Sequence, residues 1–198
     1  MKPLELRIKG LNSFRDEQVI DFRRLGEYSL FGIFGPTGSG KSSILDAIIL
    51  ALYGVVPRAG SGAAGTINQM EDAAEVAFRF ELSTAEGRQE YLIQRRYRRD
   101  KNNPDSSHFA SGRLTRIAEP EAEVLASKDS ELKSMIVELL GLSAQDFTRA
   151  VVLPQGRFAE FLALKNRERT DMLERIFSLE QFGERLNRNL KNRLQAAA

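Results

Sequence analysis

The chain has 198 residues, enough for one sizeable hydrophobic core with an appendage. It contains 42% hydrophobic and 28% charged residues, as ordinary globular proteins do, and no apolar run approaches membrane-spanning length. The absence of cysteine excludes disulfides and cysteine-ligated metals, and a net charge of +2 means that nucleic-acid binding would depend on local clusters of charge. Because the N-terminal residues do not form a signal peptide, we expect a cytoplasmic protein with no membrane contact.

The chain begins with segments that predict strands. Residues 4–9 alternate apolar and charged side chains, which is typical of a strand with one wet face. Residues 18–22 predict a second strand, and the apolar run at residues 28–34 predicts a third, buried strand.

A phosphate-binding sequence follows directly. Residues 35–42 have the form G-x-x-x-x-G-K-S, and residues 43–52 predict a helix. In this strand–loop–helix context, the glycines allow backbone N–H groups to surround phosphate oxygens, and the helix N-terminus adds partial positive charge. We expect Lys41 to reach the β- and γ-phosphates and the Ser42 hydroxyl to ligate Mg²⁺. The sequence therefore predicts binding of a nucleoside triphosphate.

The next segment is rich in glycine and alanine. Residues 60–65 match G-x-G-x-x-G, but they follow a helix and open no evident one, so we interpret them as a flexible loop and not as a dinucleotide fingerprint. Residues 74–82 alternate strictly, and residues 90–99 are predicted to pair with them through a turn at residues 86–87.

The following stretch is less regular. Residues 100–112 are polar and turn-rich, which predicts a loop that carries the single histidine, His108, on the surface. Residues 113–117 predict a strand, and residues 129–140 an amphipathic helix that ends at Gly141.

Basic residues cluster in and after the 90–99 segment. The cluster consists of Arg95, Arg96, Arg98, Arg99 and Lys101, interleaved with Tyr97, and Arg113 and Arg116 are candidates to lie nearby. Since alternate residues of a strand face opposite sides, about half of these can share one surface. Phosphate contacts there would give salt-dependent DNA binding without sequence preference. A solvated edge strand protected by its charges is the alternative.

A second motif candidate lies further along. Residues 151–153 predict an apolar strand that runs into Gln155, after which a glycine-containing turn and a new helix are predicted. Beyond residue 166, apolar residues recur at three- and four-residue steps to the end of the chain. We interpret residues 1–165 as one domain and residues 166–198 as the start of a coiled-coil helix that continues in a longer polypeptide. An ordinary terminal helix packed on the domain is the alternative.

Two groups of these residues resemble a known family. Residues 11–14, 35–43, 45–48 and 51–54 resemble the N-terminal half of SMC-like DNA-repair ATPases. Residues 153–162, with 167–169 and 172–174, are similar to the bacterial SbcC family, the ATPase subunits of SbcCD nucleases. The resemblance implies an α/β fold: the N-terminal lobe of an ABC-ATPase-like P-loop NTPase with an antiparallel β subsheet and the root of a coiled coil.

The resemblance also implies roles for individual residues. Lys41 and Gln155 would be catalytic, and Ser42 and Gln155 would flank Mg²⁺. Asn12 and Ser13 fall where the family's N-terminal strand approaches the nucleotide, although an arginine is common at the Asn12 position in related ATPases. The implied contacts to ATP are made by Asn12, Ser13, Gly35, Pro36, Thr37, Gly38, Ser39, Gly40, Lys41, Ser42, Ser43 and Gln155.

Elements needed for hydrolysis are missing after Gln155. There is no apolar strand ending in Asp-Glu, no Leu-Ser-Gly-Gly signature and no switch histidine. Residues 142–145 echo the signature faintly, but they precede Gln155 and lack both glycines, so Ser143 is interpreted as a helix N-cap. In the resembled family these elements belong to a C-terminal lobe, so we expect the chain to bind ATP without turning it over alone.

The implied partners follow from the same resemblance. They are the C-terminal lobe of the same polypeptide, a second copy of the head, an SbcD-like metallophosphoesterase nuclease, and DNA bound without sequence preference. The competing functions are the head of a chromosome-organising SMC ATPase, a recombination mediator, a transporter ATPase and a pure interaction module.

Overall fold

The structure is a computed structural model that describes residues 1–25, 31–56, 59, 63, 65–84, 87–103, 106–118, 120–151 and 170. The chain divides into two compact units, Met1–Leu140 and Gly141–Ala198. None of the described helices is long and apolar enough to cross a membrane.

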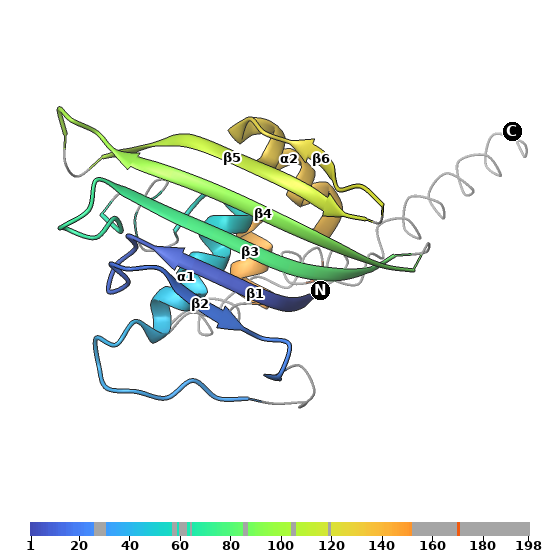
Figure 1. Ribbon diagram of the computed structural model, residues 1–198, viewed down its shortest axis with the longest axis horizontal. Coiled ribbons are helices and arrows are strands. Elements are labelled where there is room, and N and C mark those ends of the chain that lie inside the picture. The colour runs from blue at the N-terminus through green and yellow to red at the C-terminus, as the bar shows by residue number, and fades with distance from the viewer. Residues whose placement is uncertain are drawn as a thin grey trace, which may run out of the picture. The chain divides into compact units, whose positions relative to one another are not determined.

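The first unit is organised by a six-stranded antiparallel sheet with the strand order β2-β1-β3-β4-β5-β6 (Figure 1). Two helices of this unit pack on it: α1 contacts β1, β3 and β4, and α2 contacts β5, β6 and α1. The elements are β1 (Lys2–Lys9), β2 (Gln18–Asp21), α1 (Lys41–Tyr53), β3 (Ala73–Thr84), β4 (Gly87–Arg99), β5 (Ser107–Ile117), β6 (Glu123–Ala126) and α2 (Asp129–Leu140).

Alternation along the strands gives the sheet one buried and one open face. On β3, Ala74, Val76 and Phe78 are buried, whereas Glu75 between them is exposed. We call the face covered by α1 the inner face and the opposite one the outer face. The inner face carries the aromatic core, in which the rings of Phe78 and Phe80 stack with centroids 5.5 Å apart. Burial on one face fixes the register, because a slip of one residue would expose this core.

Most predicted elements of this unit are confirmed. The strands expected at residues 4–9, 18–22, 74–82 and 90–99 are β1 to β4, and the pairing of β3 with β4 places Thr84 opposite Gly87. The helices expected after the phosphate loop and before Gly141 are α1 and α2. The α/β fold class with an antiparallel sheet is therefore confirmed.

The predicted buried strand before the phosphate loop is wrong where it is described. Residues 31–34 form no strand, and Phe31 and Ile33 are each 42% exposed and Phe34 92%. An apolar run becomes a buried strand only where neighbouring strands accept its hydrogen bonds, and none of the described strands pairs with this segment. Residues 28–30 of that prediction lie outside the described residues.

The predicted loop at residues 100–112 is wrong in its second half. Strand β5 begins at Ser107, and His108 lies opposite Arg98 within the sheet. A serine- and glycine-containing segment has a weak strand propensity, and here pairing with β4 overrides it. A register shift between Arg96 and Tyr97 accommodates the irregularity. Strand β6, which is short and lies at the edge, was not predicted.

The second unit is described over residues 141–151 and 170 only. Helix α3 (Ala144–Ala150) begins as expected, with the Ser143 side chain accepting a hydrogen bond from the Asp146 backbone N–H. Val151 closes this helix and does not begin the predicted strand, because its N–H donates to the Phe147 carbonyl. The Gln155 segment and the predicted coiled-coil helix lie outside the described residues, apart from Thr170, which is helical.

The end of α1 yields a test of the packing. Gly54 has φ 71°, and a Cβ there would lie 2.8 Å from the Tyr97 hydroxyl oxygen. We expect Gly54→Ala to lower the free energy of unfolding by about 3 kcal/mol, from left-handed strain and overpacking together. Gly141→Ala is the matched control, since Gly141 follows α2 with φ 67° and nothing within 4 Å of its Cβ position. Urea denaturation should show about 1 kcal/mol for the control, and equal losses would contradict the packing described.

Candidate nucleotide-binding site

The phosphate loop adopts a conformation that depends on glycine. Gly38 and Gly40 have φ 85° and 88°, a region open to glycine and strained for other residues. Gly40 is the N-cap of α1, so the first N–H groups of the helix begin at Lys41 and have no intrahelical acceptors. These N–H groups and the positive end of the helix dipole form a site suited to an anion such as a phosphate.

Lys41 lies across the loop that it follows. Its Nζ donates to the carbonyl oxygens of Gly35, at 2.8 Å, and Pro36, at 2.7 Å. The ammonium is thus held at the edge of the loop, where it adds a full positive charge to the partial charge of the helix end. Ser42 is exposed in the first turn of α1, and its hydroxyl is the kind of hard oxygen donor that Mg²⁺ prefers.

A turn at residues 10–15 braces this loop from a distant part of the sequence. Asn12 Nδ2 donates to Ser43 Oγ at 3.1 Å, and Ser13 Oγ donates to the Gly38 carbonyl at 3.0 Å. Phe14 lies against Gly40, where a Cβ would come within 2.7 Å of the ring. The structure therefore brings Asn12 and Ser13 to the phosphate loop. The remaining sequence candidate, Gln155, lies outside the described residues.

Asn12 is itself held in an unusual conformation. Its φ of 48° makes it the one non-glycine residue with positive φ in the described part of the chain. The Asn12 N–H donates to the Thr66 carbonyl at 2.7 Å, and Asn68 Nδ2 donates to the Asn12 carbonyl at 2.6 Å. Sequence reasoning missed Asn68, because its role depends on a contact across 56 residues and no local pattern announces it.

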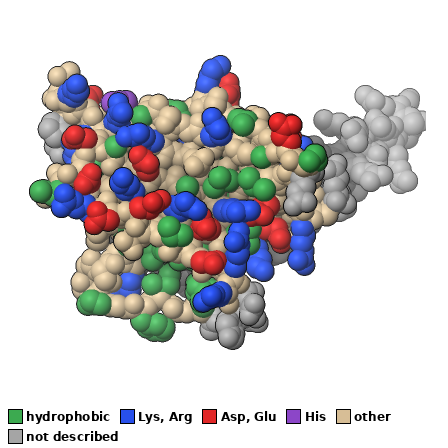
Figure 2. Space-filling model, in the orientation of Figure 1, with side chains coloured by type: hydrophobic (Ala, Val, Ile, Leu, Met, Phe, Trp, Pro, Cys, Tyr) green, Lys and Arg blue, Asp and Glu red, His purple; other side chains and the backbone are tan. Residues whose placement is uncertain are grey.

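The basic cluster is divided between the two faces of the sheet. Arg95 is buried, and Arg99 Nη2 donates to carbonyls of the 67–71 segment, the shortest distance being 2.9 Å to Asn68. Arg96 and Arg98 lie on the outer face, opposite Ser111 and His108 of β5. The expectation that about half of the cluster shares one surface is confirmed, but Arg95 and Arg99 are not part of that surface. Figure 2 shows basic and acidic side chains interspersed across the outer face.

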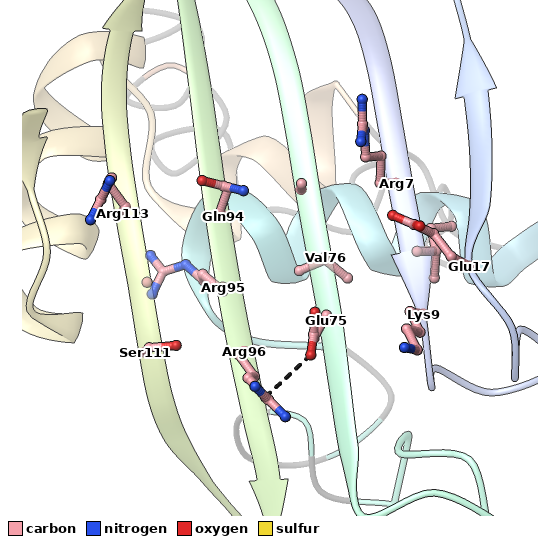
Figure 3. Close-up of a pocket in the computed structure, with 13 residues that line it drawn as sticks. Arg7, Lys9, Glu17, Glu75, Val76, Gln94, Arg95, Arg96, Ser111 and Arg113 are labelled. Carbon is pink, nitrogen blue, oxygen red and sulfur yellow. Dashed lines mark ion pairs between the residues drawn. The ribbon is translucent and has the colours of Figure 1, made fainter. Parts of the chain in front are cut away.

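A shallow groove of about 420 Å³ lies on this outer face (Figure 3). Ala77 and Ser111 are among the residues that line it, and their side chains are small. Arg96 pairs with Glu75 at 3.2 Å, whereas Lys9 and Arg113 make no ion pair with another described residue. The charged residues of the outer face that line the groove are Arg7, Lys9, Glu17, Glu75, Arg96 and Arg113. The excess of basic over acidic groups favours an anionic ligand.

Comparison with known proteins places the chain in a family. The model of a family described as AAA domain matches residues 5–197. The chain is 52% identical over 197 residues to the SbcC subunit of the nuclease SbcCD of Bacillus subtilis, covering 100% of this chain and 17% of that protein. The chain belongs to this AAA domain family. The predicted resemblance is therefore confirmed.

Other curated relatives are similar over most of this chain. The chain is 46% identical over 195 residues to the SbcC subunit of Clostridium acetobutylicum, covering 98% of this chain and 16% of that protein. It is 36% identical over 183 residues to "Probable DNA double-strand break repair Rad50 ATPase" of Aquifex aeolicus, covering 91% of this chain and 17% of that protein. The chain thus spans about a sixth of the length of these curated relatives. A solved structure, "SMC head domain from Thermotoga maritima", aligns with a TM-score of 0.35 at 22% identity, covering 60% of this chain and 39% of that chain.

Tyr97, between the buried and exposed arginines, gives a test of the division between the faces. The pKa of Tyr97 is raised to about 12, mainly by burial; nearby Arg95 opposes this shift, and the charge of Asp129 adds to it. Since the unfolded phenol titrates near pH 10, the stabilisation from Tyr97 is fully present below that pH and is lost between pH 10 and about 12. Wild-type protein should lose up to about 3 kcal/mol of unfolding free energy relative to Tyr97→Phe over this window. Parallel curves for the two proteins would show that Tyr97 is solvated.

Proposed function

We propose that the chain is the nucleotide-binding half of a split ATPase head. The observation that carries this proposal is the arrangement around the N-terminus of α1. There, Lys41 and the first free N–H groups of the helix share one loop, and Asn12 and Ser13 brace it by hydrogen bonds to Ser43 and Gly38. Membership of an AAA domain family supports the proposal, because ATP binding is the property expected of such a loop.

The proposed contacts begin with the triphosphate. Lys41 would leave the Gly35 and Pro36 carbonyls and donate to the β- and γ-phosphates, while N–H groups of the loop receive the remaining oxygens. Bound Mg²⁺ would neutralise phosphate charge, with Ser42 and Gln155 as its proposed protein ligands. The full proposed set is Asn12, Ser13, Gly35, Pro36, Thr37, Gly38, Ser39, Gly40, Lys41, Ser42, Ser43 and Gln155.

We further propose that this half-site is completed by a second lobe and by a second copy of the head. Phe31, Ile33 and Phe34 are exposed immediately before the phosphate loop, and exposed neighbouring apolar groups are typical of surfaces that a partner covers. A C-terminal lobe of the same polypeptide is the proposed partner, and two completed heads would enclose ATP between them. ATP would then hold the two heads together until its hydrolysis releases them. We propose that this happens in the cytoplasm. The chain alone would bind ATP without hydrolysing it.

The proposed consequence is control of a nuclease. A relative named as a subunit of the SbcCD nuclease and another named as a DNA double-strand break repair ATPase support this role. We propose that ATP-driven closure of the heads gates an SbcD-like metallophosphoesterase during processing of DNA breaks and hairpins. The head of a chromosome-organising SMC ATPase is the alternative, and stable association with a metallophosphoesterase would discriminate between them.

The nucleotide site has a direct test. Lys41→Ala removes the ammonium that would contact the phosphates, so we expect the affinity for Mg-ATP to fall by about 100-fold. Lys128→Ala is the matched control, since Lys128 precedes α2 and pairs with Glu131 at 3.1 Å. Isothermal titration calorimetry on both variants measures the effect. Equal affinity of wild type and Lys41→Ala would contradict the proposal.

The outer face is the proposed DNA surface. Arg96, Arg98 and Arg113 project from β4 and β5 on one side of the sheet, with Lys9 on β1, so basic side chains from three strands lie on this face among acidic ones. Such contacts to phosphates carry no sequence information, and they weaken as the salt concentration rises because the release of counterions then gains less free energy. Arg95 and Arg99 are excluded from this surface by their inward contacts.

Charge reversal tests the surface. Arg96→Glu together with Arg98→Glu should weaken duplex DNA binding by the full complex by at least about 10-fold at low salt and flatten its salt dependence. Arg88→Glu is the control, because Arg88 is exposed on the same strand but lies opposite Ser83, outside the groove. Fluorescence anisotropy at several salt concentrations gives both quantities. If the double variant binds like the control, the DNA surface lies elsewhere.

A further inference from the structure

Helix α1 is buried on nearly every side. Its sequence Lys41–Tyr53 carries buried residues at Ser43, Ile44, Asp46, Ala47, Ile49, Leu50, Ala51, Leu52 and Tyr53. Hydrophobic contact of this kind is strong but non-directional, so by itself it leaves rotation and sliding of a helix weakly determined. Hydrogen bonds are directional, and those that reach the helix from other elements therefore set its position.

Arg95 makes such contacts at the C-terminal end of α1. Its side chain is completely buried, Nε donates to the Ala51 carbonyl at 2.8 Å, and Nη2 donates to the Leu52 carbonyl at 3.1 Å. These carbonyls belong to the last turn of the helix, whose oxygens have no further intrahelical donor. Since α1 has no basic residue of its own in this turn, Arg95 supplies the positive charge that the negative end of the helix dipole favours.

The same guanidinium reaches a second helix. Arg95 Nη1 lies 2.6 Å from Asp129 Oδ1 in the first turn of α2, and Asp129 also pairs with Lys133 at 2.6 Å. A Cβ at Gly54 would lie 3.1 Å from Arg95 Nη1, so the backbone that follows α1 packs closely against the Arg95 guanidinium. One buried cation therefore ties the end of α1 to strand β4 and to the start of α2.

We infer that Arg95 is a positioning residue for the nucleotide site at the opposite end of α1. The inference rests on the proposed ATP binding. The helix is about 20 Å long and stiff, so fixing the Ala51 and Leu52 carbonyls fixes the axial and rotational position of Lys41 and Ser42. At the other end, the contact between Asn12 and Ser43 is a single hydrogen bond at 3.1 Å. By fixing the position of α1, Arg95 determines how that contact and the phosphate loop are aligned. Small displacements of ligand-binding groups strongly affect binding and reactivity.

The test separates positioning from simple stabilisation. Arg95→Met removes the directional contacts but keeps an apolar stem, and Leu114→Ala is the matched control. Leu114 is buried on β5, a strand that contacts α2, so its truncation destabilises the same unit away from the end of α1. The full-length protein is titrated with Mg-ATP at a temperature where circular dichroism shows every variant to be folded.

We expect Arg95→Met to bind Mg-ATP at least about 10-fold more weakly and Leu114→Ala to bind within about twofold of wild type, although both melt at lower temperature. Arg95→Lys should bind with intermediate affinity, because an ammonium restores the charge but lacks the planar fork that reaches both carbonyls and Asp129. Lower melting temperature with wild-type affinity in Arg95→Met would overturn the inference. If Arg95→Met does not fold, wild-type affinity in folded Arg95→Lys overturns it equally.

Lys41→Ala in the same titration separates this inference from the proposed function. If wild type binds Mg-ATP and Lys41→Ala does not, the site is established and the Arg95 variants decide the inference alone. If wild type and Lys41→Ala behave identically, the proposed nucleotide site is wrong, and the inference about Arg95 is overturned with it.

Discussion

Helix α1 has to be buried along its length and open at its N-terminus, and the rest of the described structure follows from that constraint. Its apolar sides are covered by β1, β3 and β4 and by α2, which accounts for the strictly alternating inner face of the sheet. Its first turn emerges from a loop in which Gly38 and Gly40 take positive φ, so that free N–H groups and Lys41 meet at one place. This arrangement keeps the anion-binding N–H groups at the helix end in a fixed position, because the core holds the helix that supplies the charge rigidly.

Strand β4 separates structural from surface roles residue by residue. Arg95 and Arg99 point inward, where one holds the end of α1 and the other holds the segment that carries Asn68. Arg96 and Arg98 point outward to a face with an excess of basic groups along its groove. Arginines adjacent in the sequence thus lie on opposite faces of the sheet, and the effect of substituting one of them does not predict the effect of substituting its neighbour.

Much of this could be predicted from the sequence because the signals are local. The phosphate loop is a contiguous motif, and the alternation of residues 74–82 reports directly on burial. The run at residues 31–34 was misassigned because hydrophobicity indicates a need for burial, while a strand also needs partners for its backbone. The start of β5 at Ser107 and the short strand β6 were missed because pairing with neighbours, and not local propensity, decides them. The roles of Arg95 and Asn68 depend on contacts across 44 and 56 residues, for which a single sequence carries no signal.

The proposed nucleotide site consists of the N-terminus of α1 and the residues that brace it, and it would bind a triphosphate. Backbone amide chemical shifts, recorded by NMR during a titration with Mg-ATP, test it most directly. We expect the largest shifts at Gly38, Gly40, Lys41 and Ser42, with smaller ones at Asn12 and Ser13. Saturable shifts confined to the outer face of the sheet, with the loop unchanged, would contradict it.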